Sequence, residues 1–197
     1  MWTMVREAAL AALIGLLDAY SGFAHLLHSR AMQKLLTIVT SMGLMRWKTL
    51  PFGPKNAPPE FQAAINEVFK ELIPQYVRIF VDDLCARTGR RSPGMQARQD
   101  SKLVTAHHEL LDRIGEIASR EGLMFKFPKA QFLKEVVEVV DFEAGRGKVR
   151  MTDKRCERLI NAPRPRTVGE MVSYLGALGF VRNMLPPEYS EIAGRLR

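Results

Sequence analysis

The chain has 197 residues, of which 47% are apolar and 25% charged, and a formal net charge of +8. This composition excludes a disordered tail or a low-complexity linker, and it indicates one domain, or one domain with a small appendage. No apolar run reaches the roughly 18 residues that span a bilayer. Two cysteines are too few for a secreted disulfide framework, so we expect an intracellular, reducing compartment: the cytoplasm or nucleus, with an organelle as the open alternative.

The positive charge is concentrated in the second half of the chain. Residues 1–84 hold 8 basic and 7 acidic side chains, whereas residues 85–197 hold 21 and 14. A basic surface of this kind typically binds polyanions such as nucleic acid backbones. The alternative is that Lys and Arg only keep a small domain soluble.

The N-terminal segment admits two interpretations. Arg6 followed by the apolar run 8–17 resembles a signal peptide or an organelle presequence, so residues 1–13 are either a native start or a targeting remnant. The run has no clean cleavage site and leads directly into Asp18. We therefore favour a buried strand that carries an acid at its end.

Further elements follow from the periodicity of apolar residues. Weak alternation over residues 35–50 predicts a strand pair. Asn56, followed closely by two prolines, predicts the start of an amphipathic helix. Residues 76–86 form an apolar strand, the adjacent acids Asp82 and Asp83, and a shorter apolar return. This pattern predicts a hairpin with two carboxylates at its tip.

The second half begins with an expected basic loop at residues 87–102. A long helix over about 104–121 follows, with strand-like runs at 123–127 and 136–142 and a turn around Gly145. The remainder is predicted to be helical, and Thr167 with Glu170 has the spacing of a capping box. The order of elements predicts an α+β domain with a small helical extension.

Three acids suggest a chemical function. Asp18 and the pair Asp82 and Asp83 come from segments that a mixed sheet can place side by side. Converging carboxylates raise each other's pKa values unless cations neutralise them, and two Mg²⁺ ions ~4 Å apart serve phosphoryl transfer in this way. The pattern fits nucleotidyl transfer. The alternative is that the double Asp serves only as turn chemistry.

Three successive segments carry a resemblance to a known family. They are LDAYSGF at 17–23, LPFGPKNAPPEFQ at 50–62 and FVDDL at 80–84. In order and spacing they resemble motifs of reverse transcriptases from gypsy-type LTR retrotransposons, a retroviral-like class of RNA-directed DNA polymerases. The likeness extends over most of residues 14–195. It implies a right-hand polymerase palm, in which a mixed or antiparallel sheet packs on helices, with a small helical thumb-like extension.

The resemblance also implies roles for individual residues. Asp18, Asp82 and Asp83 would be the catalytic acids and would hold two Mg²⁺ ions. Phe23 would lie against the sugar 2′-OH and favour deoxynucleotides, and its alternative role is that of an ordinary core residue. The other implied contacts, to the template, the incoming base and the primer end, are Phe52, Gly53, Phe80 and Val81.

Some features depart from the family pattern. The resemblance implies a palm-like domain at 1–143, which includes the basic loop 87–102, and a thumb-like extension at 144–197. The fingers and the RNase H segment expected of the family are absent from this sequence. Where the family grips the primer, residues 139–142 read VVDF and place an acid near the expected nucleic acid.

Two functions therefore remain. One is the core of an RNA-directed DNA polymerase that uses two Mg²⁺ ions; the other is a repurposed, non-catalytic RNA-binding or structural subunit of a larger ribonucleoprotein assembly. Expected partners are RNA, DNA or both, and other protein chains of a polyprotein or ribonucleoprotein, but no membrane. The basic side chains expected to contact a nucleic acid backbone are Arg87, Arg90, Arg91, Arg98, Lys102, Lys148, Arg150, Lys154, Arg155 and Arg158.

Overall fold

The structure, a computed structural model, describes residues 1–20 and 22–196. Its contacts divide the chain into two compact units, Met1–Arg150 and Met151–Arg197. The division expected after residue 143 falls inside strand β8 (Phe142–Gly145). The observed division comes later because β8 pairs with strand β9 (Lys148–Met151), which keeps this hairpin with the first unit up to Arg150.

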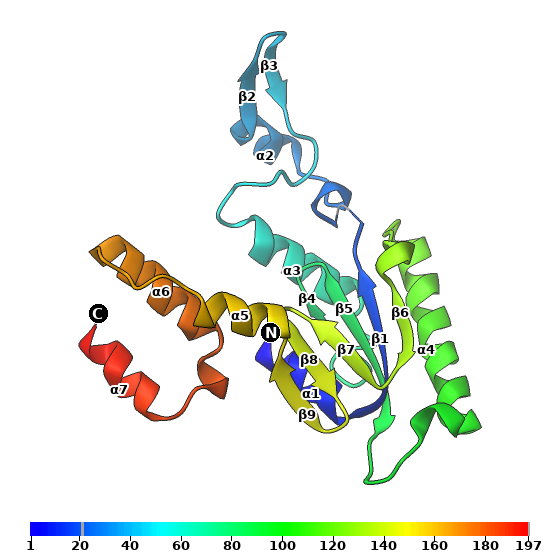
Figure 1. The fold of residues 1–197 in the computed structure, drawn as a ribbon. Helices are drawn as coiled ribbons and strands as arrows, with labels where there is room; N and C mark the ends of the chain where they lie inside the picture. Colours follow the sequence, from blue (N-terminus) through cyan, green and yellow to red (C-terminus); the bar gives the residue numbers. More distant parts are fainter. Residues whose placement is uncertain (21, 197) are drawn as a thin grey trace. The chain divides into compact units, whose positions relative to one another are not determined.

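A four-stranded antiparallel sheet forms the centre of the first unit (Figure 1). Strand β1 is central because all its residues except Asp18 are buried, and such an apolar strand needs cover on both faces. It pairs with β5 on one side and β6 on the other. The order is β4-β5-β1-β6, with β1 at Ala11–Asp18, β4 at Val77–Phe80, β5 at Asp83–Arg90 and β6 at Gln131–Lys134.

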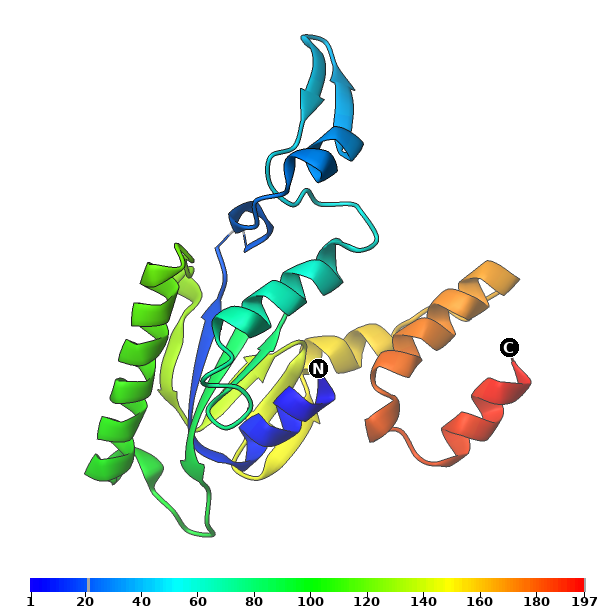
Figure 2. The ribbon, with the colours of Figure 1, turned by 180° about the vertical axis from the view of Figure 1, so that it is seen from behind.

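Two helices share a hydrophobic core with one face of this sheet. They are α3 (Ala57–Val68) and α4 (Ser101–Arg120) (Figure 2). Phe61 of α3 and Ile114 of α4 lie in the same buried cluster as Leu84 of β5. Both helices were predicted from their apolar periodicity, and the structure confirms them.

Helix α1 (Trp2–Leu10) packs on the opposite face. Successive residues of a strand point to opposite faces, so Arg78 and Arg87 point away from the core that contains Leu84. Glu7 of α1 meets both guanidinium groups: its carboxylate lies 2.8 Å from Arg78 Nε and 2.6 Å from Arg87 Nη1. These ion pairs fix α1 to the sheet.

The prediction of one strand over residues 8–17 is wrong in its first part. Helix α1 continues to Leu10, and β1 begins at Ala11. Met4, Val5 and Ala8 are buried at helical spacing. The apolar run therefore changes from a helix to a strand within a stretch whose composition does not change.

The strand pair predicted within residues 35–50 is confirmed. It consists of β2 (Thr37–Thr40) and β3 (Gly43–Arg46), preceded by the short helix α2 (Arg30–Leu35). We call residues 27–49 the arm, because a bridge between Leu27 and Thr49 closes this segment at its base. The arm projects from the rest of the unit (Figure 1).

The predicted hairpin of β4 and β5 is confirmed, but the basic loop 87–102 is not one loop. β5 continues to Arg90, because its pairing with β1 extends to Ala11. The loop proper ends at Ser101, where α4 begins, and contains a 3-10 turn at Ala97–Gln99.

The strand expected at 123–127 is absent from the described structure, where only an isolated bridge joins Phe125 to Ala19. Strand β6, which follows a 3-10 turn at Phe127–Lys129, is not among the predicted elements. The run at 136–142 becomes strand β7 (Val136–Val139) and the turn into β8. Strands β7, β8 and β9 form a separate three-stranded sheet.

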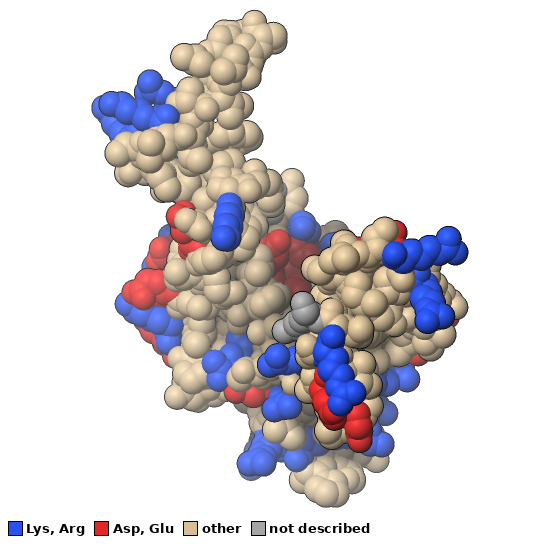
Figure 3. All heavy atoms as spheres, turned by 90° about the vertical axis from the view of Figure 1, so that its left-hand side faces the viewer, with Lys and Arg blue, Asp and Glu red and all other residues tan. Residues whose placement is uncertain are grey.

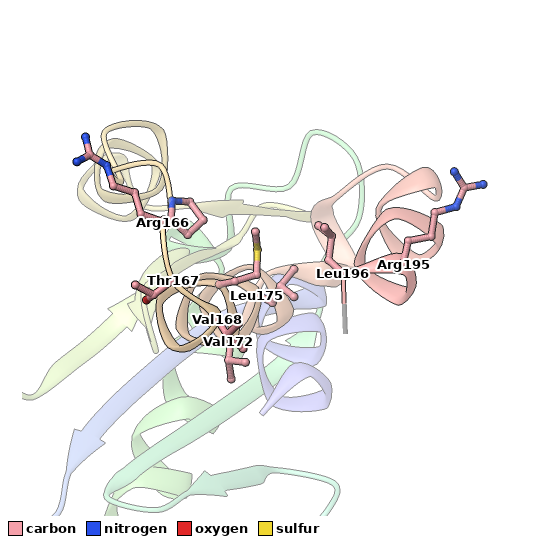
Figure 4. Close-up of a pocket in the computed structure, with 10 residues that line it drawn as sticks. Arg166, Thr167, Val168, Val172, Leu175, Arg195 and Leu196 are labelled. Atoms are coloured by element: carbon pink, nitrogen blue, oxygen red, sulfur yellow. The ribbon is translucent and has the colours of Figure 1, made fainter.

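The second unit is helical, as predicted. Its helices are α5 (Asp153–Ile160), α6 (Val168–Phe180) and α7 (Glu188–Arg195). The capping box of Thr167 and Glu170 opens α6. A hollow of about 740 Å³ lies between α6 and α7, with Leu175 and Leu196 in its lining (Figure 4). None of the helices in the described part of the chain is long and apolar enough to cross a membrane.

Candidate active site at the end of the central strands

The three predicted acids lie together at one end of the central sheet. Strands β1 and β5 run antiparallel, and their register pairs Asp18 directly with Asp83. The backbone N–H of Ala19 donates to the carbonyl oxygen of Asp82 at 2.8 Å, which ties the end of β1 to the tip of the β4–β5 hairpin. We call this tip, residues 81–83, the acidic turn. The sheet therefore brings together acids that are far apart in sequence.

The acidic turn is electrostatically unfavourable. Burial raises the pKa values of Asp82 and Asp83, and the nearby charge of Asp18 raises both further. Asp82 Oδ1 is buried and has no hydrogen-bond partner among the residues that the structure describes. An unpartnered buried carboxylate oxygen costs stability, and a cation at this position would remove that cost.

Asp18 is in a different environment. Lys126 Nζ lies 2.8 Å from one of its carboxylate oxygens, and Lys129 Nζ lies 3.3 Å from the other. Burial acts to raise the pKa of Asp18, but the hydrogen bonds and charges of the two ammonium groups outweigh it, so the net pKa is lowered. These lysines are near the acids because Lys126 N–H also donates to the Asp18 carbonyl at 2.8 Å.

The side chains do not form a ready-made metal cluster: no group of three or more His, Cys, Asp or Glu within 1–20 and 22–196 has the geometry to hold an ion. Asp18 is already neutralised by ammonium groups. The donor chemistry nevertheless fits a hard divalent cation, because carboxylate oxygens are its preferred ligands and Asp82 Oδ1 lacks a partner in the described structure.

Gln62 holds the acidic turn in place. Its side-chain oxygen accepts from Val81 N at 2.8 Å, and its side-chain nitrogen donates to the Ile79 carbonyl at 3.2 Å. Val81 has φ 54°, a left-handed conformation that a β-branched residue rarely adopts. Sequence reasoning missed this role, although Gln62 is the last residue of the middle motif.

Two of the predicted substrate-side residues, Phe23 and Phe52, pack together with Phe61. Phe23, in the 3-10 helix Gly22–His25, is buried, and its ring centroid lies 4.9 Å from those of both Phe61 and Phe52. Phe52 is 77% exposed. Gly22 permits this packing, because a Cβ there would lie 2.4 Å from Phe61 Cζ. Phe23 therefore contributes to the core from a position beside the acids.

The remaining predicted residues flank these groups. Gly53 has φ 114° and is exposed, so glycine suits a conformation that other residues rarely adopt. Phe80 is paired with Asp83 across the hairpin, and both Phe80 and Val81 are half-buried. The acidic turn is thus bounded by apolar side chains.

The predicted basic residues separate into two groups. Arg87, whose side chain is only 12% exposed, pairs with Glu7, and Arg91 pairs with Glu135. Arg150 pairs with Glu143, and in the second unit Arg155 lies over the Phe180 ring and Arg158 donates to a backbone carbonyl. Arg87 and Arg91, which are expected to contact a nucleic acid backbone, thus form ion pairs within the chain. The exposed members without a side-chain contact described above are Arg90, Arg98, Lys102, Lys148 and Lys154; Arg150 and Arg158 are exposed as well.

The motifs and the fold agree with a comparison against protein families. A model described as reverse transcriptase (RNA-dependent DNA polymerase) matches residues 3–176. The chain belongs to the reverse transcriptase family. Its α+β architecture is that of a reverse transcriptase palm.

Curated relatives of this reverse transcriptase domain are viral and transposon polyproteins. The Pro-Pol polyprotein of simian foamy virus type 1 is 31% identical over 149 residues, or 74% of this chain and 11% of the polyprotein. The Pol polyprotein from the Drosophila melanogaster transposon opus is 25% identical over 178 residues, 90% of this chain and 16% of that protein. The chain thus spans a small part of these relatives.

Solved structures show the same fold. The foamy viral protease–reverse transcriptase in complex with double-stranded DNA has a TM-score of 0.78 and 22% identity, covering 99% of this chain and 32% of that one. Its complex with an RNA/DNA hybrid has a TM-score of 0.77 and 23% identity, covering 98% and 24%.

Proposed function

We propose that this reverse transcriptase domain is the catalytic palm of an RNA-directed DNA polymerase. The observation that carries the proposal is the β1–β5 register, which sets Asp18 beside Asp83 with Asp82 tied to the same strand end. Membership of the reverse transcriptase family supports it. So do the foamy viral neighbours, which were solved in complex with double-stranded DNA and with an RNA/DNA hybrid.

Asp18, Asp82 and Asp83 would hold the metal ions in this proposal. Two Mg²⁺ ions, when bound, activate the attacking hydroxyl and stabilise the leaving oxygen of nucleotidyl transfer. The chain's own residues position these ligands: Gln62 fixes the backbone of the acidic turn, and Phe23 packs beside it against Phe52. Lys126 and Lys129 keep Asp18 ionised, and a metal ion that binds Asp18 would have to displace their ammonium groups.

The variant Asp82→Asn tests the proposal. It removes a ligand charge without adding bulk, so primer extension on an RNA template, by this chain or by a longer protein that contains it, should be lost. Circular dichroism and nucleic acid binding should stay close to those of the parent. Asp112→Asn, an exposed position on α4, is the matched control and should retain synthesis. Primer extension that persists in the Asp82→Asn variant would contradict the catalytic assignment.

A specific observation supports a second function, that of a non-catalytic nucleic-acid-binding module. No Asp or Glu occurs from residue 19 to residue 59, a segment that holds five basic residues. Within it, the arm exposes Trp47 together with its four basic side chains. Figure 3 shows Lys and Arg gathered on one side of the arm. Basic groups interleaved with an exposed aromatic ring suit single-stranded nucleic acid. The basic residues of the arm are Arg30, Lys34, Arg46 and Lys48.

Mn²⁺ binding separates the two functions. A palm that catalyses should bind Mn²⁺ through the acids, and Asp82→Asn should weaken that binding at least tenfold, as paramagnetic resonance of free Mn²⁺ would show. A module that only binds nucleic acid should bind an oligonucleotide equally well with and without the ion. Nucleic acid binding without any Mn²⁺ uptake would favour the second function.

A further inference from the structure

A polar pocket lies at the far end of β5 from the acidic turn. β5 begins at Asp83 and ends at Arg90, so the pocket lies about 25 Å along the strand from the acids. It has a volume of about 570 Å³. We call it the foot pocket, and its lining is Arg91, Met95, Gln96, Arg98, Gln99, Glu135 and Arg146.

The foot pocket joins the basic segment 91–99 to Glu135 and Arg146, which are far apart from it in the chain. Glu135, in the turn between β6 and β7, lies 3.2 Å from Arg91 Nη1 and 3.4 Å from Arg146 Nε. The β8–β9 turn packs closely here, since a Cβ on Gly145 would lie 2.1 Å from the Glu135 carbonyl oxygen. Arg146 itself has φ 52°, a strained conformation for a residue with a side chain.

The pocket has more positive than negative charge. Burial acts to raise the pKa of Glu135, but Arg91 and Arg146 outweigh it and the net pKa is lowered, so this carboxylate is ionised. It neutralises one of the lining guanidinium groups. Arg91 is mostly buried and also donates to the Met95 carbonyl at 3.1 Å, so it forms the base of the pocket.

Two guanidinium groups are left for a ligand. Arg146 is 67% exposed, and only its Nε faces Glu135. Arg98 is exposed; the Glu135 carboxylate accepts a hydrogen bond from its backbone, but its guanidinium group forms no ion pair in the described part of the chain. Gln96 and Gln99 add amide donors to the lining. Planar guanidinium forks with neighbouring amides match the oxygens of a phosphate group.

We propose that the foot pocket binds a phosphate group between Arg98 and Arg146. The phosphate could belong to a free nucleotide or to a nucleic acid backbone, because both present the same oxygens to these side chains. This site goes beyond the proposed polymerase function, since it is too far from the acids to take part in their chemistry.

The direct test is to titrate the full chain and follow the arginine Nε–Hε signals by NMR. Inorganic phosphate, ADP and a single-stranded 12-nucleotide DNA are the three probes. The signals of Arg98 and Arg146 should shift, while that of Arg113, exposed on α4 and paired with Glu71, should not. Saturation by ADP or phosphate identifies a free-phosphate site, and saturation by the oligonucleotide alone identifies a backbone site.

Variants make the test quantitative. Arg98→Gln and Arg146→Asn should each weaken binding of the active probe about tenfold, because each removes a charge-assisted hydrogen bond. Asn tolerates the left-handed backbone at position 146. Arg113→Gln removes the same charge elsewhere and should leave binding unchanged. Shifts spread equally over all exposed arginines, or unchanged affinity in both pocket variants, would overturn the proposal. None of these readouts depends on DNA synthesis, so they are independent of the Asp82→Asn result.

Discussion

At the scale of single residues, the acidic turn places ionised groups where the fold disfavours them. Burial raises the folded-state pKa of Asp83, and the charges of Asp18 and Asp82 raise it further. A raised carboxyl pKa means that the folded state binds its proton more tightly than the unfolded state does. The contribution of Asp83 to stability is therefore fully present below its unfolded-state pKa of 3.8. It is lost as the pH rises through the higher folded-state pKa of Asp83.

We therefore expect Asp83→Asn to raise the melting temperature at pH 7 by a few degrees, and this gain to disappear near pH 3.5, because the amide stays neutral at every pH. Differential scanning calorimetry at both pH values measures this. Asp112→Asn, which is exposed, provides the control and should shift neither value. A destabilised Asp83→Asn at pH 7 would show that the carboxylate is favourably solvated.

Sequence alone could predict the acids but not their surroundings. The three carboxylates were identifiable because the motifs that contain them are contiguous. Lys126, Gln62 and Glu7 were not, because each acts through a contact between segments distant in the chain. For the same reason the ion pair of Arg87 was not predictable: its acidic partner is on a helix that the pattern did not predict.

At the scale of elements, helix α3 fixes the tip of the hairpin through hydrogen bonds of one side chain. Gln62→Ala would remove the acceptor for Val81 N and the donor to the Ile79 carbonyl. We expect a loss of about 1–3 kcal/mol in the free energy of urea unfolding, because backbone groups at the acidic turn are left unpaired. DNA synthesis should fall as well, because the turn loses its support.

Asn66→Ala is the matched control for that experiment. Asn66 lies one turn further along α3 and accepts a hydrogen bond from Gln62, but within the described residues it makes no hydrogen bond to the hairpin. Asn66→Ala should lower the free energy of unfolding much less than Gln62→Ala does. Equal effects of the two variants would mean that Gln62 acts on the helix rather than on the turn.

Elements were predictable where their periodicity was strong. Helices α3 and α4 and the capped α6 bury regular apolar positions or begin with a capping box. Strand β6 was missed because its four residues alternate only between half-buried and exposed, and its pairing with β1 is irregular. Helix α1 was missed because its apolar face runs without a break into β1.

At the scale of the whole molecule, the arginines serve two different purposes. Arg87→Glu would place a carboxylate against Glu7 in a mostly buried position, so we expect a loss of roughly 3 kcal/mol or more in unfolding free energy. Arg90→Glu changes an exposed residue on the same strand and should leave stability nearly unchanged. Equal melting temperatures for the two variants would contradict the assigned ion pair.

The basic residues of the arm lead to a prediction about how oligonucleotide binding depends on salt concentration. If Arg46 and Lys48 contact phosphates of a single strand, replacing both with Ala should reduce the slope of log affinity against log salt by ~1.4, at ~0.7 per contact. Trp47→Ala should weaken binding with little change in slope, because stacking releases no counterions. Fluorescence anisotropy with a labelled oligonucleotide measures both. Glu67→Ala, exposed on α3, is the control for folding and general charge.

The antiparallel pairing of β1 also determines when the sheet can form. Ile14 pairs with Arg87 and Lys134, so ribosomes complete the apolar central strand well before either neighbour exists. At about 5–20 residues per second, the last partner emerges several seconds later. During that interval β1 is an exposed hydrophobic segment of a nascent chain. Chaperone supply and translation speed, rather than final stability alone, should therefore govern how much folded protein a cell recovers.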